Sequence, residues 1–382
     1  MSFSAGLILG ALAALAGFAL VDQLGDDDSG SSLSEQAQAI IEANYFEEVA
    51  DEELQEDSVR GMVSSLRRRY DDRFSHYFTP ADLETFNQAT SGEFSGVGLT
   101  VNEVSRGLRI AEVLPDSPAK DAGLKAGEFI TKVDGESIAG EPAQVSTGLI
   151  KGEPGTSVEL TIEPPKGERR VVEVKRASVR LPVADGRIVR TQDGTRVAHV
   201  HFKGFSKGAH GELREEIERL DAKGAEGLIL DLRANGGGLL NEAVLSSSLF
   251  VEEGEDVVRT RSRARGETIY DATGGRLDER PTAVLINRDT ASAAEILAAA
   301  IQSYDLGTVI GEPSFGKGTF QEIIELPAGG AMDLTVGEYL TADEVSLAGE
   351  GVQPDVRAVD VRRTPEDEAV ERALRELSGD LP

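Results

Sequence analysis

Three short, largely apolar runs in the second half of the chain constrain its fold most strongly. They are GLILDL at 227–232, AVLIN at 283–287 and TVI at 308–310. Runs of this kind are typical of strands that are buried on both faces of a parallel sheet. Helical patterns stand between them, at Ala209–Ala222, Glu242–Phe250 and Ala293–Tyr304. The alternation predicts an α/β core over about residues 180–360, with one more amphipathic helix at Glu366–Leu377.

The chain before this core changes pattern twice. Residues 33–90 read as helical, with helices expected at Leu33–Phe46 and Val59–Tyr70, and offer a surface for packing or dimerisation. From Phe94 the pattern becomes short strands and turns, with a short helix from Ala119 and a second at Ala143–Ile150. This stretch therefore predicts a compact, β-rich module of about 85 residues.

The N-terminal segment is set apart from the rest by its composition. Ala5–Val21 contains 17 residues without a charge, and an acidic Gly/Ser stretch follows at 25–32. Such a run is slightly short for a spanning helix but long enough for a signal-anchor. We expect an exported protein, membrane-anchored or secreted, that lies outside the cytoplasm. The alternative is a buried core helix, which the polar tether disfavours.

Composition excludes several classes of function. The chain has 39 Lys and Arg against 68 Asp and Glu, a formal charge of −29, which argues against binding to a nucleic-acid backbone. It contains no cysteine, so disulfides, thiol nucleophiles and thiolate metal sites are ruled out. Its four histidines are scattered at 76, 199, 201 and 210, and the pair in a strand-like run favours a structural or surface role. We therefore expect no metal and no cofactor.

Residues of the types that catalysis requires are concentrated in three segments of the α/β part, which we call the three chemical segments. They are DLRANGGG at 231–238, TASAAE at 290–295 and GEPSFGKGTFQ at 311–321. A serine between a strand and a helix, such as Ser292, stands at a helix N-terminus, where positive potential stabilises negative charge. Burial of Lys317 among glycines and phenylalanines would lower the pKa of its ammonium group and make it a base. Gln321 could orient Lys317, while the glycine run and Ala293 could supply N–H groups to an oxyanion.

Each of these residues also has a plain structural interpretation. Lys317 could be a loop lysine paired with Glu312, Ser292 a helix cap, and Gly236–Gly238 a flexible turn. Two other enzyme classes fit less well. The segment 311–319 departs from the P-loop pattern directly after Lys317, and no Gly-x-Ser-Gly-Gly motif of the chymotrypsin type is present.

The β-rich module carries a first family resemblance. Its motifs, in order, are FSGVGL at 94–99, VLPDSPA at 113–119, AGL at 122–124 and the strand and turn at 127–135. Together they resemble a PDZ domain. In that family the Gly96–Leu99 loop would bind a terminal carboxylate through converging N–H groups, so Gly96, Val97, Gly98 and Leu99 are candidate substrate-binding residues.

The three chemical segments, following such a module, resemble the carboxyl-terminal processing proteases (tail-specific proteases, peptidase family S41). The resemblance covers about residues 35–360 and includes a closing motif, GEGVQPDV at 349–356. It implies Ser292 as nucleophile, Lys317 as general base, Gln321 as its support, and Gly238 and Ala293 as oxyanion donors. Two departures occur: Ala294 replaces the usual serine, and Thr341–Leu347 lacks the usual turn before the closing motif.

The resemblance implies a crotonase/ClpP-like α/β protease core with an inserted PDZ domain and an N-terminal helical segment. The expected boundaries are 1–32 for anchor and tether, 33–92 for the helical region, 93–178 for the PDZ domain, 179–362 for the core and 363–382 for the last helix. The expected function is a serine endopeptidase that cleaves exported proteins near unstructured apolar C-termini. The alternative is a non-catalytic PDZ scaffold. Expected partners are substrates with free C-termini, the membrane, an adaptor or activator, and further copies of the chain.

Overall fold

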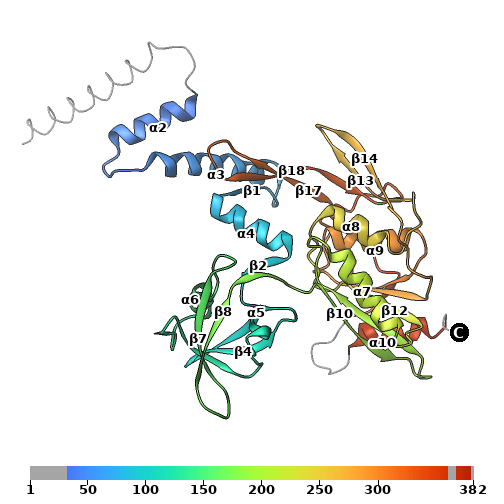
Figure 1. The fold of residues 1–382 in the computed structure, drawn as a ribbon. Coiled ribbons are helices and arrows are strands. Elements are labelled where there is room, and N and C mark those ends of the chain that lie inside the picture. The colour runs from blue at the N-terminus through green and yellow to red at the C-terminus, as the bar shows by residue number, and fades with distance from the viewer. Residues whose placement is uncertain (1–31, 360–366, 380–382) are drawn as a thin grey trace, which may run out of the picture. The chain divides into compact units, whose positions relative to one another are not determined.

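A computed structural model describes residues 32–359 and 367–379 (Figure 1). These residues form two units: one contains the described residues up to 80 together with 322–335, and the other contains 81–321 and the described residues from 336 onward. The predicted anchor at Ala5–Val21 and the acidic stretch as far as residue 31 lie outside the described residues. Within the ranges that are described, no helix is both long and apolar enough to span a bilayer.

The described residues of the first unit before residue 80 form two helices and a short strand. They are α2 (Leu33–Asn44), α3 (Asp51–Tyr70) and β1 (His76–Phe78). Helix α3 begins earlier than the predicted Val59, because Asp51, Glu52 and Glu53 in its first turn complement the positive end of the helix dipole. Strand β1 pairs antiparallel with the first residues of β18 (Ala331–Leu340), with His76 opposite Asp333.

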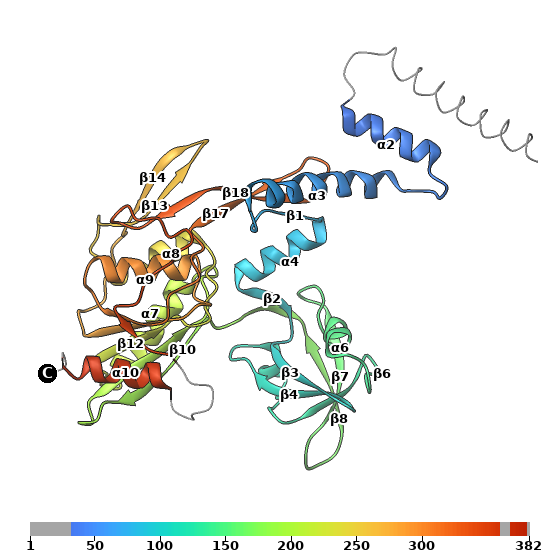
Figure 2. The same ribbon diagram turned by 180° about the vertical axis from the view of Figure 1, so that it is seen from behind.

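The β-rich module of the second unit is built on a sheet of order β3-β4-β5-β7-β8, with β6 paired to β5. Its elements are β3 (Leu99–Val104), β4 (Gly107–Val113), α5 (Pro118–Asp121), β5 (Phe129–Val133), β6 (Glu136–Ser137), α6 (Ala143–Ile150), β7 (Ser157–Glu163) and β8 (Arg170–Lys175). Helix α6 packs against β3, β4 and β5 (Figure 2). Among the residues that the structure describes, β3 pairs only with β4, so its other edge is open to a further strand.

Flanking elements lead into and out of this module. Helix α4 (Pro80–Ser91) comes first, and β2 (Glu93–Gly96) then pairs antiparallel with β9 (Ala177–Arg180). Strand β9 leads into the α/β core.

The α/β core contains a six-stranded sheet of order β10-β11-β12-β15-β16-β19. The strands are β10 (Ala184–Arg190), β11 (Arg196–Phe202), β12 (Gly227–Asp231), β15 (Thr282–Ile286), β16 (Thr308–Gly311) and β19 (Val356–Arg357). Strands β11 to β19 run parallel, and β10 alone is antiparallel to its neighbour. Every residue of β12 and β15 is buried, as their apolar sequences predict.

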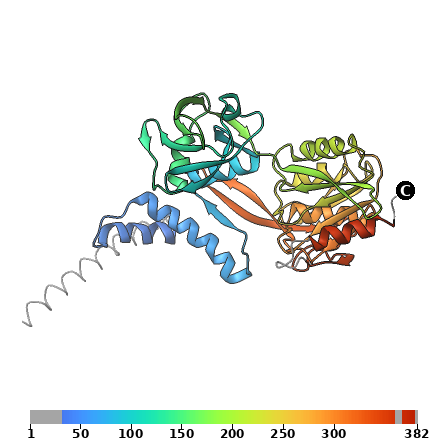
Figure 3. The same ribbon diagram turned by 90° about the horizontal axis from the view of Figure 1, so that it is seen from below.

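Helices cover both faces of this sheet (Figure 3). Leu228 and Leu230 join the apolar cluster of α7 (Ala209–Asp221), α8 (Leu240–Ser247) and α9 (Ala293–Ser303). Ile229 faces the other way and packs with Ala373 and other apolar residues of α10 (Glu368–Leu377). The pleat of β12 thus alternates its side chains between two separate apolar layers.

The sequence patterns missed part of the structure beside this sheet. Strands β13 (Asp256–Ser262) and β14 (Gly266–Asp271) form a hairpin, and β13 also pairs with the end of β18. Strand β17 (Thr319–Glu325) pairs with β18 as well, and it agrees with the strand that the sequence predicts at Phe320–Leu326. Charged residues such as Arg259 and Glu338 interrupt the apolar alternation of β13 and β18, so the sequence carries no clear strand signal in those two strands.

A buried ionic network anchors α10 to the sheet. Arg233 donates two hydrogen bonds to Asp231, at the end of β12, and two to Asp367, which also caps α10. His199 Nε2 lies 3.1 Å from Asp231 Oδ2, an oxygen that Arg233 also binds. Burial alone would raise the pKa of Asp231, but the hydrogen bonds from Arg233 and His199 outweigh it and hold this pKa well below its usual value.

Asp231→Asn should lower the free energy of unfolding by about 3 kcal/mol at neutral pH, because it removes a buried carboxylate and leaves the half-buried Arg233 with one carboxylate partner. The native carboxylate has a lowered pKa, so its stabilisation is present at neutral pH and is lost as the pH falls below about 4. The variant should therefore lose less stability than the native protein on acidification. Urea unfolding at a series of pH values measures both effects.

The matched control is Asp185→Asn, which removes an exposed carboxylate paired with Lys203 on the same sheet. Equal unfolding free energies for the two variants at neutral pH would contradict a stabilising role for the Asp231 network.

Candidate active site

The three chemical segments meet at one edge of the parallel sheet. Strands β12, β15 and β16 are parallel neighbours, so their carboxyl ends lie at the same edge. The segment 231–238 follows β12, the segment 290–295 follows β15, and the segment 311–321 follows β16. Loops at the carboxyl ends of such strands are the usual position for a functional site in open α/β sheets.

Ser292 occupies a strained turn between β15 and α9. Its backbone has φ 57° and ψ −118°, a conformation that is uncommon for a residue with a side chain. Its exposed fraction is 6%. The turn ends directly at Ala293, the first residue of α9, whose N–H has no acceptor inside the helix. This is the strand-to-helix arrangement that presents a serine hydroxyl beside a helix N-terminus.

Hydrogen bonds from two other loops hold this turn in place. The Ala291 N–H donates to the carbonyl of Asn235 at 2.9 Å, and the Thr290 hydroxyl donates to the carbonyl of Leu232 at 2.9 Å. The Phe315 N–H donates to the carbonyl of Thr290 at 2.9 Å. The segment 290–295 is thus hydrogen-bonded to both of the other segments, which compensates for the strain at Ser292.

Glu295 links the segment that contains Ser292 to the segment that contains Lys317. This carboxylate is fully buried, on the first turn of α9. One of its oxygens accepts the N–H groups of Ser292, at 2.7 Å, and of Lys317, at 3.0 Å. The other accepts the Gly316 N–H, at 2.7 Å, and the Ser314 hydroxyl. We did not predict Glu295, although the Ser-x-x-Glu spacing of a capping box signals such a contact.

The closing motif supports the same loop from outside. Ser314 and Val352 exchange two hydrogen bonds, and the Gly349 N–H donates to the Gly316 carbonyl at 3.0 Å. A Cβ on Gly351 would lie 2.4 Å from the Ser314 hydroxyl, so only glycine fits there. The Gly349–Val356 segment is therefore a structural support for the loop that contains Lys317.

Gln321 follows this loop in β17. Its side-chain amide donates to the Thr319 hydroxyl at 3.5 Å. Thr319 and Gln321 alternate with Phe320, so the two polar residues share one face of the strand. The expectation that Gln321 supports Lys317 stays a prediction.

The glycine run packs directly on Ser292. A Cβ on Gly237 would lie 2.9 Å from the Ser292 Cβ and 2.9 Å from the Ala293 nitrogen, so this position must be glycine. The Gly237 N–H is already bound, because it donates to the Asn235 side chain at 2.9 Å. Gly238 forms a parallel β-bridge with Phe205, in which the Phe205 N–H donates to the Gly237 carbonyl and the Leu239 N–H donates to the Phe205 carbonyl. In this pairing the Gly238 N–H is directed away from Phe205. The run is a close-packed part of the site rather than a flexible turn.

The structure bears on two of the structural alternatives. Glu312, the partner suggested for Lys317, forms an ion pair with Arg288 at 3.0 Å. Ser292 does stand at the helix-cap position, where it forms a capping box with Glu295.

The candidate PDZ loop has the shape expected from its glycines. Gly98 has φ 83°, and a Cβ there would lie 2.3 Å from the Ser117 Cβ. The carbonyls of Val97 and Gly98 accept the N–H groups of Ala119 and Leu114, at 2.8 Å and 3.0 Å. Gly96 ends β2 and Leu99 begins the open-edged strand β3. The four residues thus lie together at the start of that edge.

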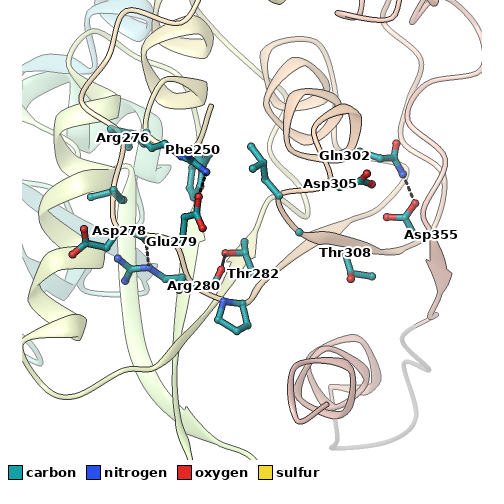
Figure 4. A pocket seen from close by; sticks show the side chains of 15 residues that line it. Phe250, Arg276, Asp278, Glu279, Arg280, Thr282, Gln302, Asp305, Thr308 and Asp355 are labelled. Atoms are coloured by element: carbon teal, nitrogen blue, oxygen red, sulfur yellow. Dashed lines mark hydrogen bonds and ion pairs between the residues drawn. The ribbon is translucent and has the colours of Figure 1, made fainter. Parts of the chain in front are cut away.

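A separate polar cavity lies at the other end of the sheet (Figure 4). It has a volume of about 650 Å³ and lies where β15 and β16 begin, whereas Ser292 follows the end of β15. Its charged groups bind one another: Arg276 donates to Glu279 at 2.8 Å, and Gln302 donates to Asp355 at 2.7 Å. This cavity is therefore distinct from the candidate active site.

Comparison with known proteins identifies both parts of the second unit. Residues 196–358 match the family model of peptidase family S41, and residues 109–164 match that of the PDZ domain. The chain is 33% identical over 318 residues to the carboxy-terminal processing protease CtpA of Bacillus subtilis, covering 83% of this chain and 66% of that protein. It is 34% identical to the carboxyl-terminal-processing protease of a Picosynechococcus species, and the match covers 78% of this chain and 72% of that protein.

A solved structure agrees with these relatives. The photosystem II D1 C-terminal processing protease is 28% identical, with a TM-score of 0.52 over 91% of this chain and 97% of that one. The fold is accordingly a mixed α/β protease fold with a PDZ domain. The chain belongs to the carboxyl-terminal processing proteases of peptidase family S41, which are serine-type peptidases.

Proposed function

We propose that this protein is a serine endopeptidase in which Ser292 is the nucleophile and Lys317 is the general base. The observation that carries the proposal is the buried Glu295 carboxylate, which binds the backbone N–H groups of both residues. Two segments far apart in the sequence are joined at a single oxygen atom. Nothing in a peptide-binding scaffold requires a strained serine and a lysine to be fixed in this way.

The reaction would proceed through an acyl-enzyme. Lys317, as a neutral amine, accepts the proton of the Ser292 hydroxyl as Oγ attacks the scissile carbonyl. The N–H groups of Ala293 and Gly238 stabilise the oxyanion that forms. Lys317 then gives its proton to the leaving amine and removes one from the water that hydrolyses the ester. Gln321 would orient the Lys317 side chain.

Histidine is a poor alternative for the base. His199 is bound to Asp231 on the sheet face that α10 covers, whereas Ser292 begins α9 on the opposite face. His210 is bound to Glu242 at 2.8 Å. Both imidazoles are therefore held by carboxylates in their own structural contacts, which supports Lys317 in the role of base.

Substrates would enter through the PDZ domain as an added strand. Strand β3 has an open edge, and the Gly96–Leu99 loop at its start would bind the terminal carboxylate through its N–H groups. Val145 and Leu149, four residues apart on α6, expose 49% and 44% of their surface beside this strand. Apolar side chains at that position favour substrates with unstructured, apolar C-termini.

We place this activity at the cell envelope. The proposal rests on the uncharged segment Ala5–Val21 and the acidic stretch that follows it. Fractionation of cells that express the full chain tests it: recovery in the cytoplasmic fraction would contradict an exported protease.

Ser292→Ala and Lys317→Ala should each reduce cleavage of an unfolded protein with an apolar C-terminus by about 10⁴-fold or more. The reason is that each variant removes one half of the nucleophile–base pair. Full-length protein in detergent is assayed, and fragments are identified by mass spectrometry. Lys203→Ala, which removes an exposed lysine paired with Asp185, is the matched control and should retain full turnover.

Turnover that survives in Lys317→Ala would refute the assignment of the base. A wild-type protein that binds tails without cleaving them would instead favour the scaffold function.

Glu295→Gln should reduce kcat about 10- to 100-fold and lower the free energy of unfolding by about 1–3 kcal/mol. The amide has one acceptor oxygen in place of two, so buried N–H groups of the two catalytic segments lose their partner. Kinetics and urea unfolding measure the two effects. Glu312→Gln, at the partner of Arg288, is the control and should change stability by less than about 0.5 kcal/mol. Wild-type kinetics in Glu295→Gln would show that the carboxylate does not position the site.

Val145→Glu should weaken binding of an apolar C-terminal peptide by at least about tenfold, because it places a charge in the apolar wall beside β3. Fluorescence anisotropy with the Ser292→Ala protein measures binding without cleavage. Val171→Glu is the matched control, since Val171 is a comparably exposed valine on β8 of the same domain. Equal affinities for the free-acid and the amidated peptide would contradict capture of the terminal carboxylate.

A further inference from the structure

Glu242 is a buried carboxylate that the proposed reaction does not use. It lies on the first turn of α8, shortly after the glycine run at 236–238, and its exposed fraction is 6%. One of its oxygens accepts the Gly208 N–H at 2.7 Å. The other accepts the His210 N–H at 3.1 Å and lies 2.8 Å from Nδ1 of the His210 imidazole. Glu242 thus binds three groups at the beginning of α7.

The Glu242 carboxyl is ionised at neutral pH. Burial alone would raise its pKa, but the hydrogen bonds from Gly208 and His210 outweigh burial and hold this pKa below its usual value. N–H groups at the start of a helix have no acceptor within that helix, and the positive end of the helix dipole favours a negative charge beside them. One carboxylate on the first turn of α8 therefore joins the N-terminal ends of α7 and α8.

The segment 205–210, which leads into α7, also holds the candidate oxyanion donor Gly238. The Phe205 N–H donates to the Gly237 carbonyl at 3.1 Å, and the Leu239 N–H donates to the Phe205 carbonyl at 2.8 Å. A Cβ on Gly238 would lie 2.5 Å from the Phe205 carbonyl oxygen, so the two backbones are in direct contact. Phe205 is itself fixed in the apolar core, where only 1% of its surface is exposed.

Segments 205–210 and 237–242 are therefore joined at both of their ends. The bridge at Phe205 connects their beginnings, and the Glu242 carboxylate connects their last residues. A Cβ on Gly237 would lie 2.9 Å from the Ala293 nitrogen, so this pair of segments also packs on the other candidate oxyanion donor. A shift of the glycine run would change the geometry between the two donor N–H groups.

We propose that Glu242 is a positioning residue for the oxyanion donor Gly238 and acts through its bonds to the start of α7. This inference rests on the proposed function. Donors that are held in position before the oxyanion forms need no reorganisation when the charge develops. Without the carboxylate, the segment 205–210 loses one of its two attachments to the glycine run. The Gly238 N–H then loses its fixed direction, while the nucleophile and the base retain theirs.

The alternative is that Glu242 only stabilises the fold. Both roles predict a loss of stability in Glu242→Gln, because the amide has one acceptor oxygen in place of two and leaves a buried N–H unpaired. Only the positioning role predicts that the folded variant reacts more slowly. A misplacement of about 1 Å at a catalytic site can reduce the rate by about 100-fold. The reaction rate of the folded protein therefore distinguishes the two roles.

The test measures how fast a small fluorophosphonate reagent labels Ser292 in the full-length protein over a range of pH. The P=O oxygen of such a reagent binds the oxyanion donors as it reacts. We expect labelling and kcat of Glu242→Gln to fall about 10- to 100-fold, with KM little changed. The pH midpoint of the labelling rate should not move, because it reports the base and not the oxyanion donors. All rates are measured below the unfolding transition of each variant.

Glu212→Gln is the matched control. Glu212 lies on the first turn of α7, is half-buried, and accepts the Val183 N–H at 2.9 Å. The control therefore removes a carboxylate that binds a backbone N–H beside the same helix end, but one that has no bond to the segment 205–210 or to the glycine run. It should lower the urea midpoint and still be labelled at the wild-type rate.

Wild-type labelling by folded Glu242→Gln would overturn the positioning role and leave the Ser292–Lys317 pair standing. An equal loss of rate in Glu212→Gln would also overturn it, because the effect would not be specific to the contact with the segment 205–210. A shifted pH midpoint would overturn it as well, since the base would then be affected. A wild-type protein that neither reacts with the reagent nor cleaves substrate would overturn the proposed function and this inference with it.

Hydrogen exchange gives a second measurement that is independent of turnover. The bond from the Leu239 N–H to the Phe205 carbonyl protects this amide from exchange. Peptides that contain Leu239, analysed by mass spectrometry, should exchange faster in Glu242→Gln than in Glu212→Gln. Equal exchange would show that Glu242 does not hold the two segments together and would overturn the inference.

Discussion

The candidate site depends on one buried carboxylate more than on any other group. Glu295 accepts hydrogen bonds from three backbone N–H groups and one hydroxyl, on the loop before α9 and the loop after β16. Each bond replaces hydration that the carboxylate loses on burial, so the four bonds together offset the free-energy cost of its desolvation. If any of the four donors moves, a buried polar group is left unpaired. The two loops that contain Ser292 and Lys317 are therefore constrained to a common geometry.

The parallel sheet explains why these loops meet. Three neighbouring parallel strands end at the same edge, and each delivers one segment of the site. The strained backbone of Ser292 is stable there because Asn235, Leu232 and Phe315 bond to the turn from both sides. Gly237 allows the closest approach, since a side chain at that position would overlap Ser292. Strain at Ser292 is thus balanced by contacts along the sheet edge.

The parts that the sequence predicted are those with a strong local signal. Buried strands such as β12 and β15 and the amphipathic helix α7 have periodicities that few other structures share. The spacing of Ser292, Lys317 and Gln321 gave the candidate site through family resemblance. Glu295 was missed although its spacing from Ser292 fits a capping box. Strand β18 could not be predicted, because it alternates charged and apolar residues and pairs with partners far away in the sequence.

The most direct test of the central claim is to trap the covalent intermediate. An unfolded protein with an apolar C-terminus is mixed with the full-length wild-type enzyme, quenched in acid within milliseconds to seconds, and digested for mass spectrometry. The account predicts an ester that joins the N-terminal fragment of the substrate to the peptide containing Ser292. Cleavage with an adduct on another residue would contradict it. So would cleavage without any adduct, because water would then attack the scissile carbonyl directly.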